Sequence, residues 1–114
     1  MATPEGIILN SILEYLAVRR IWCRRMNTGA IEVDKRFFRY GSVGMADILC
    51  TPTAWVTING VTFGRISVVW IEVKTAKGKQ SPAQVAFQKE VESEGHGYVV
   101  ARSIEDVDNY LRSL

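Results

Sequence analysis

The centre of the chain carries the stretch VVWIEVKT, residues 68–75, in which Glu72 and Lys74 interrupt an otherwise apolar and largely β-branched run. This composition predicts a buried strand. Because a strand points residues i and i+2 to the same face, Glu72 and Lys74 project together, while Ile71 and Val73 face the other way. Burying charge is costly unless it is paired or holds a metal, so the strand also marks a candidate site.

A second acid, Asp47, enters another strand-like run from the segment GMAD, residues 44–47. Two carboxylates for a divalent cation and an ammonium for the water or phosphate are what metal-dependent phosphodiester cleavage needs. Asp47 could instead be a turn residue, and Glu72 with Lys74 a solvent-exposed surface pair. Trp70 shares the face of that pair, which indicates that this side of the strand is partly covered and favours the metal site.

The chain has 114 residues, which predicts a single domain spanning 1–114. No apolar run approaches the ~20 residues of a membrane span, and no basic region precedes the N-terminal apolar stretch. Cys23 and Cys50 are too few for a disulfide framework, so we expect core cysteines and a cytoplasmic setting. Residues 19–79 carry eleven basic and four acidic residues, which is typical of a polyanion-facing surface or of a solvated face.

A helix is expected to begin with Thr3 as the N-cap and Pro4 at its first position, and to run to about Val18. Glu5 lies on the apolar stripe of this helix, so it is expected to point toward the interior, while Glu14 points to solvent. The alternative for Glu5 is that an acid in the first turn merely complements the helix dipole.

The rest of the chain alternates strand and turn signals before two further helices. Strands are expected at residues 20–27, 30–33, 36–40, 46–50, 54–58, 61–64, 68–75 and 98–101. Asn59-Gly60 predicts a type I′ hairpin turn, and Asp34-Lys35 another turn. The fold class is therefore α/β, a mixed β-sheet flanked by helices in the order α-β-β-β-β(hairpin)-β-α-β-α.

Ser81 and Gln84 match a capping box that opens the second helix, and Ser103 opens the third. Gln84 also shares a helical face with Phe87, so it could point into the site instead of only capping the helix. His96 lies between two glycines and is expected to be a solvent residue without a catalytic role.

Lys77 and Lys79 follow the central strand closely, and they are either phosphate contacts beside the site or residues of a solvated loop. Arg24 and Arg25 lie on an expected strand, so some of these arginines should face DNA if the chain is a nuclease.

In this order, the motifs resemble those of the VRR-NUC (virus-type replication-repair nuclease) domains of the PD-(D/E)xK nuclease superfamily. The matching pieces are Glu5 with Ile8, Ile12 and Tyr15-Leu16, then NTG 27–29, GMAD 44–47, IEVKT 71–75, SPAQ 81–84 with Phe87, and GYVVARS 97–103. Two departures stand out. Ala46 replaces the Pro of the superfamily's name, and the segment between Asp47 and Glu72 is long, with an extra hairpin that could modify the substrate surface or a subunit contact.

The resemblance implies a restriction-endonuclease-like core and a specific set of site residues. The implied active site comprises Glu5, Asp47, Glu72, Lys74 and Gln84. The implied cofactor is Mg²⁺ or Mn²⁺, held by Asp47, Glu72, the Val73 carbonyl and Glu5, the last directly or through water. If the chain is a nuclease, the candidate DNA contacts are Arg24, Arg25, Lys77 and Lys79. No small-molecule cofactor is implied.

We therefore expect a divalent-metal-dependent endonuclease acting on branched DNA, most simply a homodimeric Holliday-junction resolvase. A junction needs two symmetric nicks, which a twofold dimer supplies, and the apolar segment 61–63 is a candidate contact. One rival is a flap or nicking nuclease. The other is a non-catalytic DNA-binding module with salt-sensitive, metal-independent binding. The resemblance also suggests a bacterial cytoplasm and a phage or prophage origin.

Overall fold

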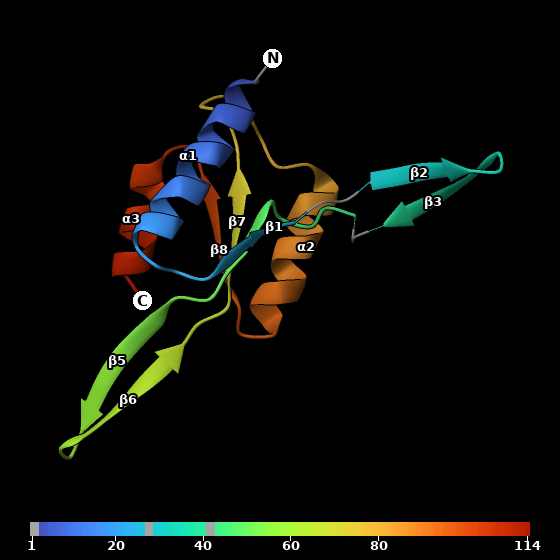
Figure 1. Ribbon diagram of the computed structural model, residues 1–114. Coiled ribbons are helices and arrows are strands. Elements are labelled where there is room, and N and C mark those ends of the chain that lie inside the picture. The colour runs from blue at the N-terminus through green and yellow to red at the C-terminus, as the bar shows by residue number, and fades with distance from the viewer. Residues whose placement is uncertain (1–2, 27–28, 41–42) are drawn as a thin grey trace.

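The computed structural model describes residues 3–26, 29–40 and 43–114, with the backbone alone for residues 29–33 and 37–40. In chain order the elements are α1 (Pro4–Val18), β1 (Cys23–Arg25), β2 (Gly29–Val33), β3 (Arg36–Tyr40), β4 (Ile48–Cys50), β5 (Thr53–Ile58), β6 (Val61–Ile66), β7 (Val69–Val73), α2 (Pro82–Ser93), β8 (Gly97–Ala101) and α3 (Ile104–Arg112) (Figure 1). Residues 27–28 of the NTG motif and residues 41–42 of the loop before Asp47 lie outside the described residues.

The main sheet has four strands in the order β1-β4-β7-β8. The β1–β4 and β4–β7 pairs are antiparallel, whereas β7 and β8 are parallel. The parallel pair is joined through α2, as a parallel connection requires. The expected mixed sheet with flanking helices is confirmed, and β7 is one of its two inner strands.

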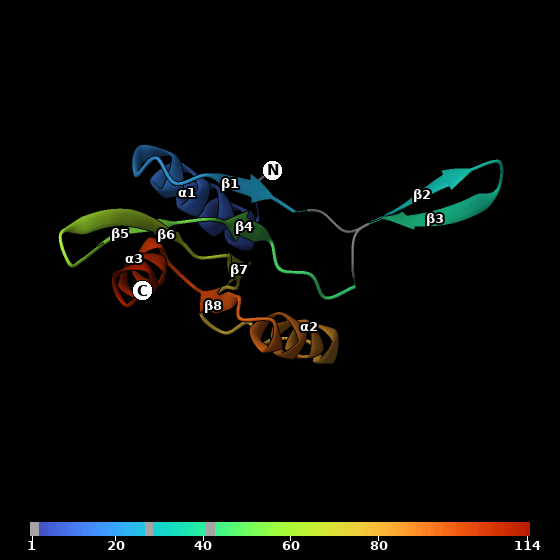
Figure 2. The ribbon, with the colours of Figure 1, turned by 90° about the horizontal axis from the view of Figure 1, so that it is seen from below.

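Helices cover both faces of this sheet. α1 and α3 pack together on one face, and α2 packs on the other (Figures 1 and 2). Under α1 and α3 lies the main core, formed by Leu9, Ile12, Leu16, Ile48, Cys50, Val69, Ile71, Val73, Ala101 and Val107. Under α2 lies a smaller cluster of Ala46, Phe87, Val91 and Tyr98, against which Trp70 packs. The face of β7 that carries Trp70 is therefore covered, as predicted.

The first helix begins as expected, because the Thr3 hydroxyl accepts a hydrogen bond from the Gly6 N–H at 3.0 Å and Pro4 occupies the first turn. Glu5, however, is exposed, so the expectation that it points into the interior is wrong. Burial along this face of α1 starts only at Leu9, because the first turn lies at the edge of the layer that the sheet covers.

The first strand is shorter than predicted. β1 spans only Cys23–Arg25, although the sequence predicted a strand over residues 20–27. The chain first turns at Arg20, which has a positive φ of 56° and whose N–H bonds to the Ala17 carbonyl at the end of α1. Extended structure can therefore start only after this turn.

Two hairpins stand apart from the main sheet, because β2 pairs only with β3 and β5 only with β6. Both close through two-residue turns with positive φ at each position, at Asp34-Lys35 and at Asn59-Gly60, which confirms the expected turns. The hairpins leave the body on opposite sides (Figure 2). The radius of gyration is accordingly 16.1 Å, against about 13 Å for a compact chain of this length.

None of the helices in the described part of the chain is both long and apolar enough to cross a membrane.

Candidate active site

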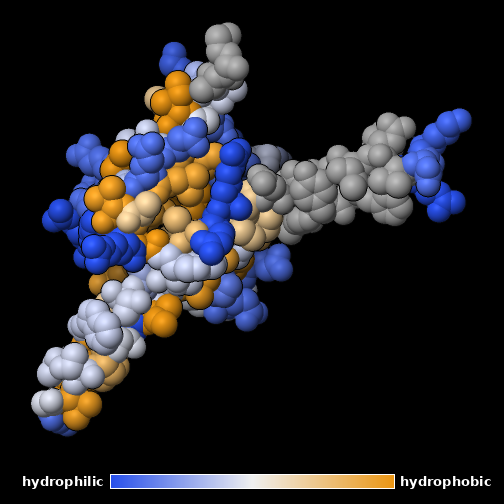
Figure 3. All heavy atoms as spheres, viewed as in Figure 1, coloured by the Kyte–Doolittle hydropathy of each residue, from blue (hydrophilic) through white to orange (hydrophobic). Residues whose placement is uncertain are grey.

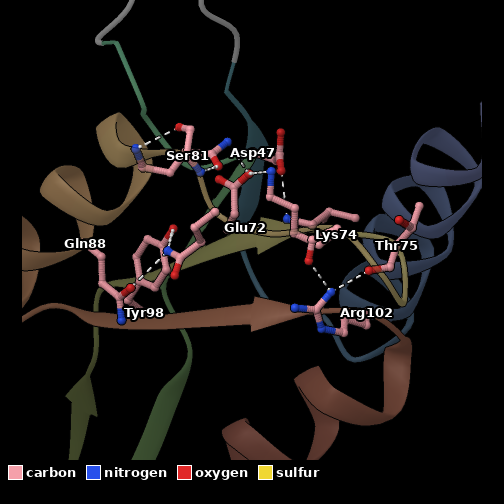
Figure 4. A network of polar contacts seen from close by, with 12 residues as sticks. Asp47, Glu72, Lys74, Thr75, Ser81, Gln88, Tyr98 and Arg102 are labelled. Atoms are coloured by element: carbon pink, nitrogen blue, oxygen red, sulfur yellow. Dashed lines mark hydrogen bonds and ion pairs between the residues drawn. The ribbon is translucent and has the colours of Figure 1, made fainter.

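Asp47 and Glu72 come together because β4 and β7 are neighbouring antiparallel strands. Ile48 pairs with Ile71, so the residue that precedes β4 lies beside the end of β7. Asp47 Oδ2 accepts a hydrogen bond from the Val73 N–H at 2.7 Å, which fixes its carboxylate against the strand that carries Glu72 (Figure 4). The sheet register therefore brings together two acids that are 25 residues apart in the sequence.

Glu72 is the buried acid of the site, with only 1% of its surface exposed. Its Oε1 accepts a hydrogen bond from Gln84 Nε2 at 3.0 Å and lies 3.7 Å from the Lys74 ammonium. Its Oε2 is buried without a hydrogen-bond partner among the described residues. Burial, reinforced by the nearby Asp47 carboxylate, raises the pKa of Glu72 to about 8, although the Lys74 charge opposes this shift.

Gln84 fills both roles that the sequence left open. Its Oε1 accepts from the Ser81 N–H at 2.8 Å, and its own N–H donates to Ser81 Oγ, which completes the capping box. The amide nitrogen of the same side chain remains available to donate to Glu72. The Gln84 side chain therefore hydrogen-bonds to Glu72, and not to Lys74.

The loop before Asp47 approaches the first turn of α2 closely at Gly44. This residue has a φ of 78°, and a Cβ placed there would collide with the Ala83 carbonyl. Only glycine combines this conformation with so short an approach. Gly44 thus sets the path of the chain into Asp47 and holds α2, with Gln84, close to the two acids.

A pocket of about 420 Å³ opens beside Asp47, between the first turn of α1 and the ends of β1, β4 and β7, and its lining does not include Glu72 or Lys74. Its lining includes Glu5, Arg25, Asp47, Val73 and Thr75. Glu5 and Asp47 thus line the same pocket, so Glu5 is exposed to the pocket instead of being buried in the core. Arg25 is the one predicted DNA-contacting arginine in this lining.

The loop after β7 carries the remaining predicted cations. Lys77 and Lys79 are exposed there. Arg102, which follows β8, donates to the carbonyls of Thr75 and Gly78 and so ties this loop to the sheet (Figure 4). Sequence reasoning did not assign Arg102 a role, because a side chain that binds backbone carbonyls of another segment leaves no local pattern.

Arg24 points elsewhere. Its guanidinium lies over the Trp22 ring, 4.7 Å from the ring centroid, and donates to the Cys23 carbonyl. Because neighbouring residues of a strand face opposite sides, Arg24 and Arg25 serve different surfaces of the molecule. The two arginines that the sequence suggested as DNA contacts therefore lie on different surfaces, Arg24 against Trp22 and Arg25 in the pocket beside Asp47.

His96 is not the solvent residue that its glycine neighbours predicted. It is half-buried, and its Nδ1 accepts a hydrogen bond from Trp70 Nε1 at 3.0 Å. Trp70 in turn packs edge-on against Phe87, with ring centroids 5.0 Å apart. His96 therefore helps to fix the layer that covers Glu72, because the indole N–H of a buried Trp needs an acceptor.

A second polar chain lies under the loop that leads into α2. Gln80 Nε2 donates to Gln88 Oε1 at 3.0 Å and to the Tyr98 hydroxyl at 3.1 Å (Figure 4). These contacts join β8, α2 and the loop beside the candidate site. No pattern in the sequence indicated these hydrogen bonds, because the residues that form them come from three different segments of the chain.

The oxygen atoms of Asp47 and Glu72 could supply some, but not all, of the ligands of a hard cation such as Mg²⁺. Within residues 3–26, 29–40 and 43–114, no group of three or more His, Cys, Asp or Glu side chains is arranged to surround a metal ion. Mg²⁺, however, commonly takes one or two carboxylates and completes its shell with water and substrate phosphates. Asp47 and the unpaired Oε2 of Glu72 provide such a pair.

Comparison of the chain with protein-family models, with curated proteins and with solved structures finds no match in any of the three.

Proposed function

We propose that this chain is a divalent-metal-dependent DNA endonuclease of the VRR-NUC type, with a restriction-endonuclease-like core. One observation carries the proposal: among the described residues Glu72 is buried beside Asp47 and Lys74 with no hydrogen-bond donor at Oε2, and its pKa of about 8 means that ionising it beside Asp47 near neutral pH requires a compensating positive charge. A buried carboxylate oxygen without a hydrogen bond is costly, so its retention needs a reason. A cation bound between Glu72 and Asp47 supplies that reason.

The residues present fit such a cation, because every donor in reach is an oxygen, as Mg²⁺ and Mn²⁺ prefer. Asp47 and Glu72 would hold it, with Glu5 across the pocket and the Val73 carbonyl as further oxygen donors. A bound divalent cation would make the attacking water more acidic and neutralise charge on the phosphate. This role also accounts for the exposed position of Glu5, which lies where an outer ligand is needed.

The chain's own residues then position the reacting groups. Lys74 presents its ammonium 3.7 Å from Glu72 Oε1, with 13% of the side chain exposed, where it can stabilise negative charge that develops on the phosphate. Gln84 holds the Glu72 carboxylate in one orientation, and the Val73 N–H does the same for Asp47. Because these contacts exist before substrate binds, little reorganisation remains for the transition state.

DNA is the proposed substrate because cations flank the acids. Arg25 lines the pocket, and Lys77 and Lys79 project from the loop that Arg102 holds. In this proposal these three side chains contact phosphates of the DNA near the scissile bond. The proposed setting is a bacterial cytoplasm, in a phage or prophage context, as the resemblance implies.

Branched DNA and a twofold dimer complete the proposal, because a four-way junction needs two symmetric nicks. The β5–β6 hairpin offers a contact surface. Ile58, Val61 and Phe63 share one of its faces and expose 54%, 63% and 44% of their surfaces. Figure 3 shows hydrophobic side chains reaching the end of this hairpin. Two copies that pack these faces together would bury them and give the isolated hairpin the support it lacks.

The test is cleavage of a labelled four-way junction, beside a flap and a linear duplex, in Mg²⁺ and in Mn²⁺. Paired symmetric nicks that disappear in Lys74→Ala are the expected result, and sedimentation should show a dimer. Cutting only at the flap or the linear duplex would keep the nuclease and discard the resolvase. Metal-independent binding without any product would leave a DNA-binding module in place of an enzyme.

A further inference from the structure

A second pocket, of about 480 Å³, lies at the opposite end of α1 from the candidate active site. It is bounded by Arg19 and Arg20 after α1, by Trp22 before β1, and by Trp55 on β5. Ile21 and Leu111 are among the apolar residues that line it. α1 has 15 residues, so the two pockets are separated by about 22 Å along the helix.

Both tryptophans are unusually exposed for their size. Trp22 exposes 49% and Trp55 75% of its surface. Trp55 lies flat over Gly64, because the aromatic ring occupies the space that a side chain at the paired position would fill. Both tryptophans line the pocket. Large exposed aromatic surfaces around a concave site are typical of ligand recognition.

The charged residues that line this pocket are both arginines. Arg19 is held by Asp108 at 3.2 Å. The ion pairs formed among the described residues do not involve Arg20, nor Arg24, which stacks on Trp22. Arg20 lines the pocket, and Arg24 lies outside the lining but against Trp22, so two exposed cations adjoin the two exposed indoles. This combination matches a polyanion that carries planar rings.

We propose that this pocket binds unpaired bases of single-stranded DNA, with Trp22 and Trp55 stacking on bases and Arg20 and Arg24 contacting phosphates. Bases inside a duplex are stacked on one another and cannot enter such a pocket, whereas flipped or single-stranded bases can. The inference rests on the proposed DNA-directed function only in taking DNA as the nucleic acid. It adds that the substrate has a single-stranded segment near the branch.

The experiment measures binding of a labelled oligo(dT) of twelve nucleotides to the full chain. EDTA is present to remove divalent cations, so that the DNA is not cleaved during the measurement. We expect quenching of tryptophan emission and binding that weakens as salt rises. Trp55→Ala should weaken binding about tenfold, as the loss of one stacked base predicts. The control is Thr62→Ala, which truncates an exposed side chain on β6 of the same hairpin that belongs neither to the pocket lining nor to the proposed dimer face, and it should leave binding unchanged.

A second variant guards against loss of the hairpin in Trp55→Ala. Arg20→Gly removes the charge at a position whose positive φ suits glycine, so the fold should be kept or slightly stabilised. It should lower the slope of log affinity against log salt by about 0.7, which is the contribution of one phosphate contact on a single strand.

Wild-type binding by Trp55→Ala and Arg20→Gly alike would overturn the proposal, as would failure of the wild-type chain to bind oligo(dT). Salt-independent binding of oligo(dT) would also overturn it, because it would show that the arginines make no phosphate contacts. Oligo(dT) binding that follows these expectations in a chain that never cleaves DNA would preserve this site and remove the nuclease proposal. DNA cleavage by a chain that does not bind oligo(dT) would keep the nuclease proposal and remove the single-strand site.

Discussion

Ile71 and Glu72 are adjacent residues of β7, they expose 0% and 1% of their surfaces, and they face opposite layers of the molecule. Under α1 and α3, Ile71 joins a wholly apolar core. Under α2, Glu72 has one oxygen satisfied by Gln84, and the other has no hydrogen-bond partner in the part of the chain that the structure describes. The same degree of burial therefore stabilises the fold on one face of the strand and opposes it on the other. This difference separates the residues that hold the sheet from those that are available for chemistry.

The largest expected effect falls on the polar face. Glu72→Gln keeps an oxygen that can accept from Gln84 but removes the charge. Cleavage should fall by roughly a thousandfold, about 4 kcal/mol of activation free energy, while the protein stays folded. Single-turnover cleavage and circular dichroism on the same sample check this. Wild-type cleavage by Glu72→Gln would show that the charge of Glu72 is not needed for the reaction.

A substitution on the apolar face of β7 should lower stability and leave cation binding unchanged. Ile71→Ala is expected to lower the free energy of unfolding by roughly 2–5 kcal/mol, because a fully buried side chain is truncated in a packed core. The protein that remains folded should keep its response to Mg²⁺. Urea unfolding measures the loss, and a change below about 1 kcal/mol would contradict the assigned packing.

Gly44→Ala tests how the backbone supports the polar face. The substitution combines a strained positive φ with a collision at Ala83, so we expect a loss of about 2 kcal/mol and reduced cleavage. Gly60→Ala is the matched control, since that residue also has a positive φ but no atom near the position of a Cβ. Urea midpoints should fall further for Gly44→Ala than for Gly60→Ala.

Cation binding should appear as a modest gain in stability that depends on the polar face alone. At a Mg²⁺ concentration tenfold above its dissociation constant, the gain is about 1.4 kcal/mol, which raises Tm by several degrees. Differential scanning fluorimetry should show this shift for the wild type and lose it in Asp47→Asn, which can still accept from the Val73 N–H. An unchanged shift in the variant would place the cation elsewhere.

The smallest effect should lie outside both faces of β7, at Asp108. Hydrogen bonds from Tyr15 and Arg112 lower the pKa of this carboxyl below its usual range. The stability that it contributes is therefore present above the ordinary pKa of an Asp and is lost as the pH falls through the lowered value. Asp108→Asn should be slightly less stable at pH 7, and the difference should vanish near pH 2 in thermal unfolding.

Sequence patterns predicted those parts of the molecule that local chemistry determines. The cap at Thr3, the capping box at Ser81 and the two-residue turn at Asn59-Gly60 were all found where expected. The strand period also placed Glu72 and Lys74 on one face, where their charged atoms lie 3.7 Å apart. Each of these signals acts over a few residues, so one sequence suffices to detect it.

Features set by tertiary structure escaped this approach. The exposure of Glu5 depends on where the sheet ends, and the acceptor role of His96 depends on where Trp70 packs. Likewise, the separation of both hairpins from the main sheet follows from strand order, which local patterns do not encode. The pocket between Trp22 and Trp55 joins segments from both ends of the chain, and it became visible only in the fold.

The base of the β5–β6 hairpin is closed by a hydrogen bond from the Ser67 N–H to the Pro52 carbonyl, at 3.0 Å. The chain thus leaves β4 and returns to β7 at almost the same point. An evolutionary gain, loss or exchange of everything between residues 52 and 67 would leave the pairing of β4 with β7, and with it the two acids, in place. The hairpin is in this sense a separable module, whose length and sequence can change without moving the two acids.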